Sequence, residues 1–436
     1  MERLFSRFLE EWLYQVKRKP LILRGARQVG KTWLVRDLAS RSKRELVEIN
    51  FERNPEHKRH FAGNDPLITL NALSLTLNRD IDPSKCILFL DEIQAAGEIL
   101  SKLRWFAEEM PQMPIVAAGS LLEFTLADPA FSVPVGRVAF RNVEPLGFEE
   151  FLMAHEQYIL LKAITAWRPG LSLSVAAHEQ ARLWFHRFTM VGGMPEVVAA
   201  DVAGATPSHC RELQHDLVAA FRADFSKYSG RMHDGILDSV LRSVAGSIGR
   251  KFIYAKAGDG IKQHQAKRAL ELLAAARVCH LVRYTAANGL PLGSEIKDTF
   301  RKAVLLDVGL LHALLGTRAA GAFPTERDLS PDLRSRIAEQ TTAQHLRLQS
   351  GNGTGEPDLY YWQREGGRPG EIDYIGVWQN RIVPVELKSG AAGSMKSLHQ
   401  FMFDKKLQLA VRCDTNRPGE MEIKMSTPRG TRFNFT

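Results

Sequence analysis

The sequence predicts an α/β fold that begins with a doubly wound parallel sheet. Three short, largely apolar runs, 21–23, 86–90 and 114–120, have the length and composition of buried strands. Neighbouring parallel strands need crossover connections, which are usually helices, so a series of such units favours helices on both faces of the sheet. Helical spacing over 5–14 adds a leading helix, and alternation over 45–51 adds a strand.

The first strand runs into a glycine-rich loop and then into a predicted helix over 33–39. This order is the context that a phosphate-binding loop requires, because backbone N–H groups and the helix N-terminus can surround a phosphate. We expect Lys31 to contact the β- and γ-phosphates and the Thr32 hydroxyl to ligate Mg2+. The residues predicted to bind ATP in this loop are Gly25, Ala26, Arg27, Gln28, Val29, Gly30, Lys31 and Thr32.

Polar residues follow the second and third strands. Asp91 is predicted to bind Mg2+ and Glu92 to orient or deprotonate the attacking water, since open α/β sheets bind ligands at this edge. Ser120 could contact the γ-phosphate, or it could cap the helix from Leu121 onward. Arg137 is a candidate arginine finger, with an ordinary surface arginine as the alternative.

Composition limits the class of protein. A chain of 436 residues is too long for one core, and its net charge of +9 favours polyanionic partners. No apolar run reaches the length of a membrane span, and the start of the chain is charged. The four cysteines are scattered singly, which argues against a zinc site and for a reducing compartment. We therefore expect a cytoplasmic protein without membrane contact.

Seven strings carry a resemblance to a known family: Arg24-Gly-Ala-Arg-Gln-Val-Gly-Lys-Thr32, Leu90-Asp-Glu-Ile-Gln94, Gly119-Ser-Leu-Leu122, Gly136-Arg-Val with Glu144-Pro-Leu-Gly-Phe-Glu-Glu-Phe-Leu152, Gly192-Gly-Met-Pro-Glu196, Leu306-Asp-Val-Gly-Leu310 and Glu386-Leu-Lys-Ser-Gly390. Over nearly its whole length the chain resembles AAA+-type P-loop ATPases of bacteria and archaea that are fused to a domain of unknown function with a restriction-endonuclease-like (PD-(D/E)xK) fold. The resemblance implies a Walker B pair at Asp91 and Glu92, a sensor at Ser120, a finger at Arg137 and a homo-oligomer.

The middle of the chain predicts helices over 151–240 and then a winged-helix-like domain over 241–304. In the latter, two helical segments precede two strand-like runs separated by a turn. This segment holds twelve Lys and Arg residues against four Asp and Glu residues, most of the excess charge of the chain. DNA binding is one interpretation, and a protein–protein or interdomain module is the other.

Two alternating strands, 371–378 and 381–388, flank Gln379-Asn380 near the C-terminus. A two-residue hairpin turn there sets Asp373 opposite Glu386, with Lys388 on the same face. The two carboxylates could hold Mg2+ while the lysine orients a water or phosphate. The spacing resembles the Asp…Glu-x-Lys nuclease core, with Glu339 as the additional acid. The alternative is an exposed, salt-bridged hairpin face.

These inferences divide the chain into four parts: a P-loop ATPase domain (1–150), a helical region (151–240), a winged-helix-like domain (241–304) and a restriction-endonuclease-like domain (305–436). The resulting hypothesis is a Mg2+-dependent ATPase coupled to a nuclease-like, DNA-interacting domain in DNA processing or defence. Its rival is a nucleotide-switched regulatory or scaffold ATPase whose nuclease-like domain only binds nucleic acid or protein.

Overall fold

The computed structural model describes all residues except 135, 231, 320, 350–357, 367–369, 389–394, 427–431 and 436. The chain divides into two compact units. The first comprises Met1–Pro145 together with Ala275–Val278, and the second comprises Leu146–Ala274 and the described residues from Cys279 onward. The first boundary lies close to the predicted one at 150. The remaining three predicted parts lie in the second unit, except for Ala275–Val278 of the predicted winged-helix part.

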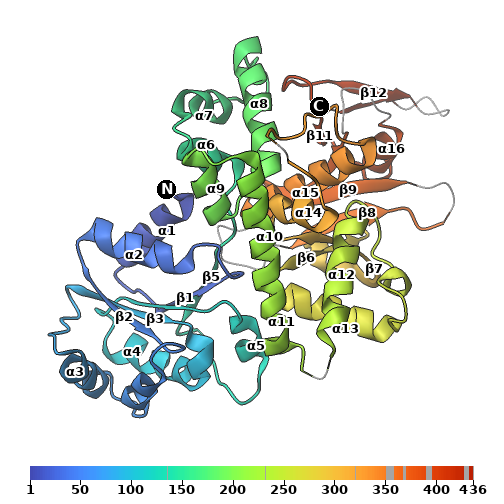
Figure 1. The fold of residues 1–436 in the computed structure, drawn as a ribbon. Helices are drawn as coiled ribbons and strands as arrows, with labels where there is room; N and C mark the ends of the chain where they lie inside the picture. The colour runs from blue at the N-terminus through green and yellow to red at the C-terminus, as the bar shows by residue number, and fades with distance from the viewer. Residues whose placement is uncertain are drawn as a thin grey trace. The chain divides into compact units, whose positions relative to one another are not determined.

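The first unit contains a five-stranded parallel sheet in the order β2-β3-β4-β1-β5. Its strands are β1 (Leu21–Arg24), β2 (Glu45–Asn50), β3 (Cys86–Asp91), β4 (Ile115–Ala118) and β5 (Ala139–Asn142). Its helical segments are α1 (Leu4–Leu13), α2 (Lys31–Ser42), η1 (Pro55–Phe61), α3 (Pro66–Leu77), η2 (Ile93–Lys102), α4 (Leu103–Glu109) and α5 (Leu122–Ala127). Figure 1 shows α2 on one face of this sheet and α3 and α4 on the other, which confirms the doubly wound arrangement.

Burial explains why the apolar runs form the central strands. All six residues of β3 are buried, because the sheet is covered on both faces. Alternate residues such as Leu88 and Leu90 join a core with Phe106 of α4. The sheet thus brings the carboxyl ends of β3, β4 and β1 to one edge, with β4 in the middle.

The second unit combines helices with a six-stranded mixed sheet in the order β11-β10-β9-β8-β6-β7. The strands of this sheet are β6 (Cys279–Thr285), β7 (Ile296–Leu305), β8 (Leu359–Gln363), β9 (Glu371–Trp378), β10 (Arg381–Leu387) and β11 (Val411–Cys413), and a separate pair is formed by β12 (Ile423–Ser426) and β13 (Arg432–Phe435). The α-helices are α6 (Phe148–Ala154), α7 (Tyr158–Thr165), α8 (Val175–Val191), α9 (Pro195–Val202), α10 (Pro207–Ala223), α11 (Phe225–Tyr228), α12 (Asp234–Ser247), α13 (Gln263–Ala275), α14 (Val308–Leu315), α15 (Pro331–Gln349) and α16 (Lys396–Lys405). Among the described residues, no helix is both long and apolar enough to cross a lipid bilayer.

The predicted winged-helix hairpin lies inside this larger sheet. β6 pairs with β7 in antiparallel fashion, as a wing would, but its other edge pairs in parallel with β8. β8 in turn pairs with β9, so the sheet crosses the predicted boundary at 304. The structure therefore differs from our expectation of a separate winged-helix domain. The local sequence pattern predicts the β6–β7 hairpin, but it gives no sign that β8, much later in the chain, pairs with β6.

The C-terminal hairpin has the predicted register. Pairs run from Arg381↔Trp378 to Val385↔Tyr374, and the positive φ angles of Gln379 (47°) and Asn380 (58°) suit a two-residue turn. Just beyond the last of these pairs, the backbone N–H of Leu387 donates to the Asp373 side chain at Oδ2 (2.8 Å).

Two of the strings that carry the resemblance meet in the core of the second unit. Asp307 is fully buried, and its carboxylate accepts hydrogen bonds from the backbone N–H groups of Gly193 (2.7 Å) and Gly309 (2.8 Å) and from Gln344 Nε2 (2.9 Å). A Cβ atom on Gly193 would come within 3.0 Å of the Leu146 carbonyl oxygen. The Gly192-Gly193 turn is therefore held in place by hydrogen bonding to the buried Asp307 and by the close approach of Leu146.

We predict that Gly193→Ala lowers the free energy of unfolding by roughly 1–3 kcal/mol, because an added methyl group must displace backbone. The matched control is Gly246→Ala in α12, where nothing lies within 4 Å of the added methyl and the helix favours alanine. Urea unfolding of both variants checks this. Equal free energies of unfolding for the two variants would contradict the inference that close packing at Gly193 requires glycine.

Candidate nucleotide-binding and acidic sites

The predicted phosphate loop connects β1 to α2. Its backbone has positive φ at Gly25 (143°), Gln28 (65°) and Gly30 (93°), and α2 begins directly afterwards at Lys31. A Cβ atom on Gly25 would come within 3.0 Å of the Val143 carbonyl oxygen. Glycine is thus required at the first position both by conformation and by the close approach of the neighbouring chain segment.

The Lys31 side chain lies buried inside this loop. Its ammonium group donates to the carbonyl oxygens of Gly25 (2.9 Å) and Ala26 (2.7 Å). Burial lowers the pKa of Lys31 to about 8, although the nearby carboxylates of Glu92 and Asp91 act in the opposite direction. The lysine is therefore held by neutral oxygens, and a phosphate would supply the missing negative charge.

Asp91 ends β3 beside the start of α2. The Thr32 hydroxyl lies 3.3 and 3.5 Å from the two Asp91 carboxylate oxygens, and Asn50 Nδ2 lies 3.3 Å from one of them. Burial raises the pKa of Asp91 to about 6, and the charge of Glu92 adds to this effect. A hydroxyl and a carboxylate in contact are hard oxygen ligands, so this pair fits a Mg2+ ion.

Glu92 follows with a left-handed backbone (φ 50°), and its Oε2 accepts a 2.6 Å hydrogen bond from Gln94 Nε2. The Gln94 side chain also lies close to Gly119, directly after β4. A Cβ atom added to Gly119 would come within 3.0 Å of Gln94 Oε1. Ser120 comes next, and the N-cap of α5 is Leu121, without a side-chain cap. Ser120 therefore does not cap α5 in this structure. Sequence reasoning missed Gln94 and Asn50.

Arg137 does not approach the phosphate loop of its own chain. Ala139 pairs with Leu21 at the start of two parallel strands, so Arg137 lies at the amino edge of the sheet, while the loop lies at the carboxyl edge. Its Nε donates to Glu108 Oε1 at 2.6 Å, and the side chain is about half exposed. A finger that acts within one chain is thus excluded by strand direction.

A different arginine lies closer to the loop. Arg277 is buried, its Nε donates to Glu123 Oε1 at 3.1 Å, and Glu123 also forms an ion pair with Arg24 at the end of β1. Arg277 contributes to lowering the pKa of Lys31. No local sequence signal separates Arg277 from the other basic residues of its segment.

The second unit gathers the four residues of the predicted nuclease-like site. Lys388 Nζ donates to Glu386 Oε1 at 2.6 Å, and Asp373 is held by the backbone of Leu387. Glu339 extends from α15, whose carbonyl at that position accepts from Tyr374 at 3.0 Å. Burial raises the pKa of Glu339, Asp373 and Glu386, and Asp373 raises those of both glutamates further. The hairpin face carries a salt bridge, as the alternative expected, but Glu386 on it is buried and not exposed.

Two residues that the sequence did not indicate complete this cluster. Lys302 of β7 places its Nζ 3.7 Å from Glu339 Oε2 and forms an ion pair with Glu371 of β9. Within the described part of the chain, no group of three or more His, Cys, Asp or Glu side chains is arranged to hold a metal ion. Two carboxylates, those of Glu339 and Glu371, therefore lie beside the Lys302 ammonium.

A basic cleft of about 470 Å3 lies in the same unit. It is lined by Lys267, Glu271, Leu281, Arg283, Ile296, Lys297, Phe300 and Arg301, from α13, β6 and β7. Three of the cations have acidic partners: Arg283 with Asp358, Lys297 with Glu365 and Lys267 with Glu271. The charged segment singled out in the sequence therefore includes a concave surface with an aromatic ring.

Comparison with known families gives three matches. Residues 17–152 match a family described as an AAA domain, residues 182–321 match a domain of unknown function (DUF8612), and residues 334–425 match another domain of unknown function (DUF4143). No curated protein matches the chain. The first match and the five-stranded parallel sheet support an AAA-type P-loop ATPase domain in the N-terminal unit.

Two solved structures are distantly similar. The Caenorhabditis elegans PCH-2 structure is 15% identical, with a TM-score of 0.21, and the alignment covers 37% of this chain and 45% of that one. The Aeropyrum pernix ORC1 protein in complex with DNA is 14% identical, with a TM-score of 0.26, and the alignment covers 72% of this chain and 91% of that one. The chain thus spans less than half of PCH-2.

We predict that Gly25→Ala weakens ATP binding by at least about tenfold, since the loop must open to admit the methyl group. Gly63→Ala is the control in the same unit, because its added methyl meets nothing within 4 Å. Isothermal titration with ATP measures both. Wild-type affinity in Gly25→Ala would show that the loop does not bind the phosphates.

Proposed function

We propose that the chain is an ATP-binding, Mg2+-dependent ATPase coupled to a DNA-interacting domain, with a role in DNA processing or defence. The observation that carries the ATPase part is the convergence of Lys31, Thr32 and Asp91 at one edge of the parallel sheet. These three groups supply a cation for the phosphates and two oxygen ligands for the metal.

Each residue of the site has a distinct task in this proposal. The N–H groups of the loop and Lys31 bind the phosphates, while Thr32 and Asp91 hold Mg2+, which would neutralise phosphate charge when bound. Glu92 accepts the proton of the attacking water or orients it, and Gln94 fixes the Glu92 carboxylate. Ser120, at the tip of the intervening strand, is the proposed γ-phosphate contact.

Arg137 supports an oligomer in this proposal. Because it lies at the amino edge of the sheet and is about half exposed, it could serve the nucleotide of a neighbouring copy and not its own. A homo-oligomer that completes its sites between subunits is therefore the proposed active form.

Two substitutions separate binding from hydrolysis. Lys31→Ala should weaken ATP binding by at least about tenfold, because the phosphates lose their cation. Glu92→Gln should keep the affinity and slow hydrolysis by about 10²–10⁴-fold, since the amide cannot accept a proton. Phosphate release and ATP titration measure the two effects, with Lys85→Ala as an exposed-lysine control. Unchanged hydrolysis in Glu92→Gln would refute its role.

The basic cleft supports the DNA part. Four of its eight lining residues are Lys or Arg, and Phe300 offers an apolar surface between them. Such clefts attract phosphate backbones by releasing counterions, which makes the affinity strongly dependent on salt. Cleavage is a further step, and it depends on the acidic cluster.

The rival proposal, a nucleotide-switched ATPase whose nuclease-like domain only binds, is favoured by one observation. The Lys302 ammonium lies beside Glu339 and Glu371, Lys388 pairs with Glu386, and the described residues form no metal-holding group. The nuclease activity predicted from Asp373, Glu386 and Lys388 is therefore the weaker of the two proposals for this domain.

Removal of charge from the cleft should weaken DNA binding uniformly across sequences. The double variant Lys267→Gln with Arg301→Gln is expected to reduce the slope of log K against log salt by about 0.9 for each DNA phosphate that the variant no longer neutralises. Fluorescence anisotropy with a labelled duplex measures the slope. Lys162→Gln, an exposed lysine of α7, is the control for charge alone. An unchanged slope in the double variant would show that DNA does not bind in this cleft.

A further inference from the structure

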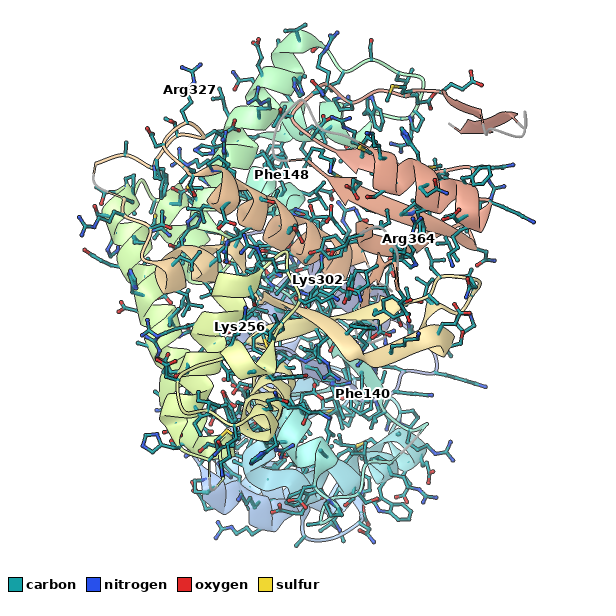
Figure 2. All side chains as sticks on the ribbon, turned by 90° about the vertical axis from the view of Figure 1, so that its right-hand side faces the viewer. Phe140, Phe148, Lys256, Lys302, Arg327 and Arg364 are labelled. Atoms are coloured by element: carbon teal, nitrogen blue, oxygen red, sulfur yellow. The ribbon has the colours of Figure 1, made fainter. Side chains whose placement is uncertain are left out.

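The acidic cluster of the second unit has a cation of its own. The Lys302 side chain is only 2% exposed, and Figure 2 labels it on the ribbon of this unit. Its ammonium group lies beside the carboxylates of Glu339 and Glu371, within electrostatic reach of Asp373, and 5.1 Å from the centre of the Tyr361 ring.

Charge balance explains why this lysine can be buried. Burial alone would lower the pKa of Lys302, but the carboxylates of Glu339, Glu371 and Asp373 raise it above its ordinary value, so the group stays cationic. In return, the ammonium lowers the free-energy cost of burying the Glu339 carboxylate. Lys388 provides the same balance for Glu386, with which it forms an ion pair.

The backbone fixes this arrangement from a second side. Gly249 follows α12 with a φ of 80°, and a Cβ atom there would come within 3.0 Å of the Glu339 carboxylate. Glu339 is thus confined between the Gly249 backbone and Lys302. Glu339 and Glu371 lie beside the Lys302 ammonium, whereas Glu386 Oε1 pairs with Lys388 and Glu386 Oε2 is buried without a hydrogen bond.

We propose that the Lys302 ammonium occupies the cation position of this cluster, so that the native chain excludes divalent metal from the nuclease-like site. The inference is independent of the ATPase proposal, because all of its groups lie in the second unit. It deepens the rival proposal for this domain, in which DNA is bound without metal-dependent cleavage.

The test is Mn2+ binding by the full chain, followed by electron paramagnetic resonance. Asp91→Asn serves as the background, because it removes the carboxylate ligand of the phosphate-loop site. In this background, adding Glu339→Gln and Asp373→Asn is expected to leave the Mn2+ stoichiometry unchanged. Loss of one Mn2+ equivalent would overturn the proposal.

The second arm removes the lysine charge. Lys302→Met is expected to bind Mn2+ at least about tenfold more tightly than its parent, and the gain should vanish when Glu339→Gln and Asp373→Asn are added. Lys302→Arg keeps the charge and should gain nothing. A folded Lys302→Met protein with parental Mn2+ affinity would overturn the proposal. If Lys302→Met does not fold, the stoichiometry of the first arm decides.

Discussion

A buried ammonium group needs oxygen partners, and the two candidate sites differ in which oxygens they provide. Lys31 has the neutral carbonyls of Gly25 and Ala26, so burial lowers its pKa to about 8 and leaves its charge poorly compensated. Lys302 has carboxylates, and its pKa is raised. The first lysine is therefore ready for an anionic ligand, while the second already has its counter-ions.

The same contrast applies to the acids. Asp91 lies at the end of a parallel strand with a hydroxyl beside it, which is a suitable pair for a metal ion that arrives with a nucleotide. Glu339 and Asp373 lie in a mixed sheet and its covering helix, where burial raises the pKa of both carboxyl groups and the Lys302 charge opposes that rise. Similar residue types thus support ligand binding in one unit and internal neutralisation in the other.

The string that contains Asp307 shows that a resemblance can mark structure and not chemistry. Its carboxylate accepts three hydrogen bonds and holds the Gly192-Gly193 turn against α14 and α15. Asp307 has no room for a ligand there, because a Cβ on Gly192 would already come within 3.0 Å of its Oδ1. The cost of leaving a buried carboxylate unsatisfied is enough to explain this pattern.

Features that depend on neighbours along the chain could be predicted from the sequence. The phosphate loop, the buried strands β1 and β3 with Asp91 at its tip, and the register of the β9–β10 hairpin all follow from local period and turn chemistry. The remaining features depend on tertiary structure. Only strand order joins β6 to β8, only strand direction separates Arg137 from the loop, and only packing brings Lys302 to Glu339 and Glu371. These contacts join residues far apart in sequence, whose approach depends on the burial of whole elements and leaves no periodic signal.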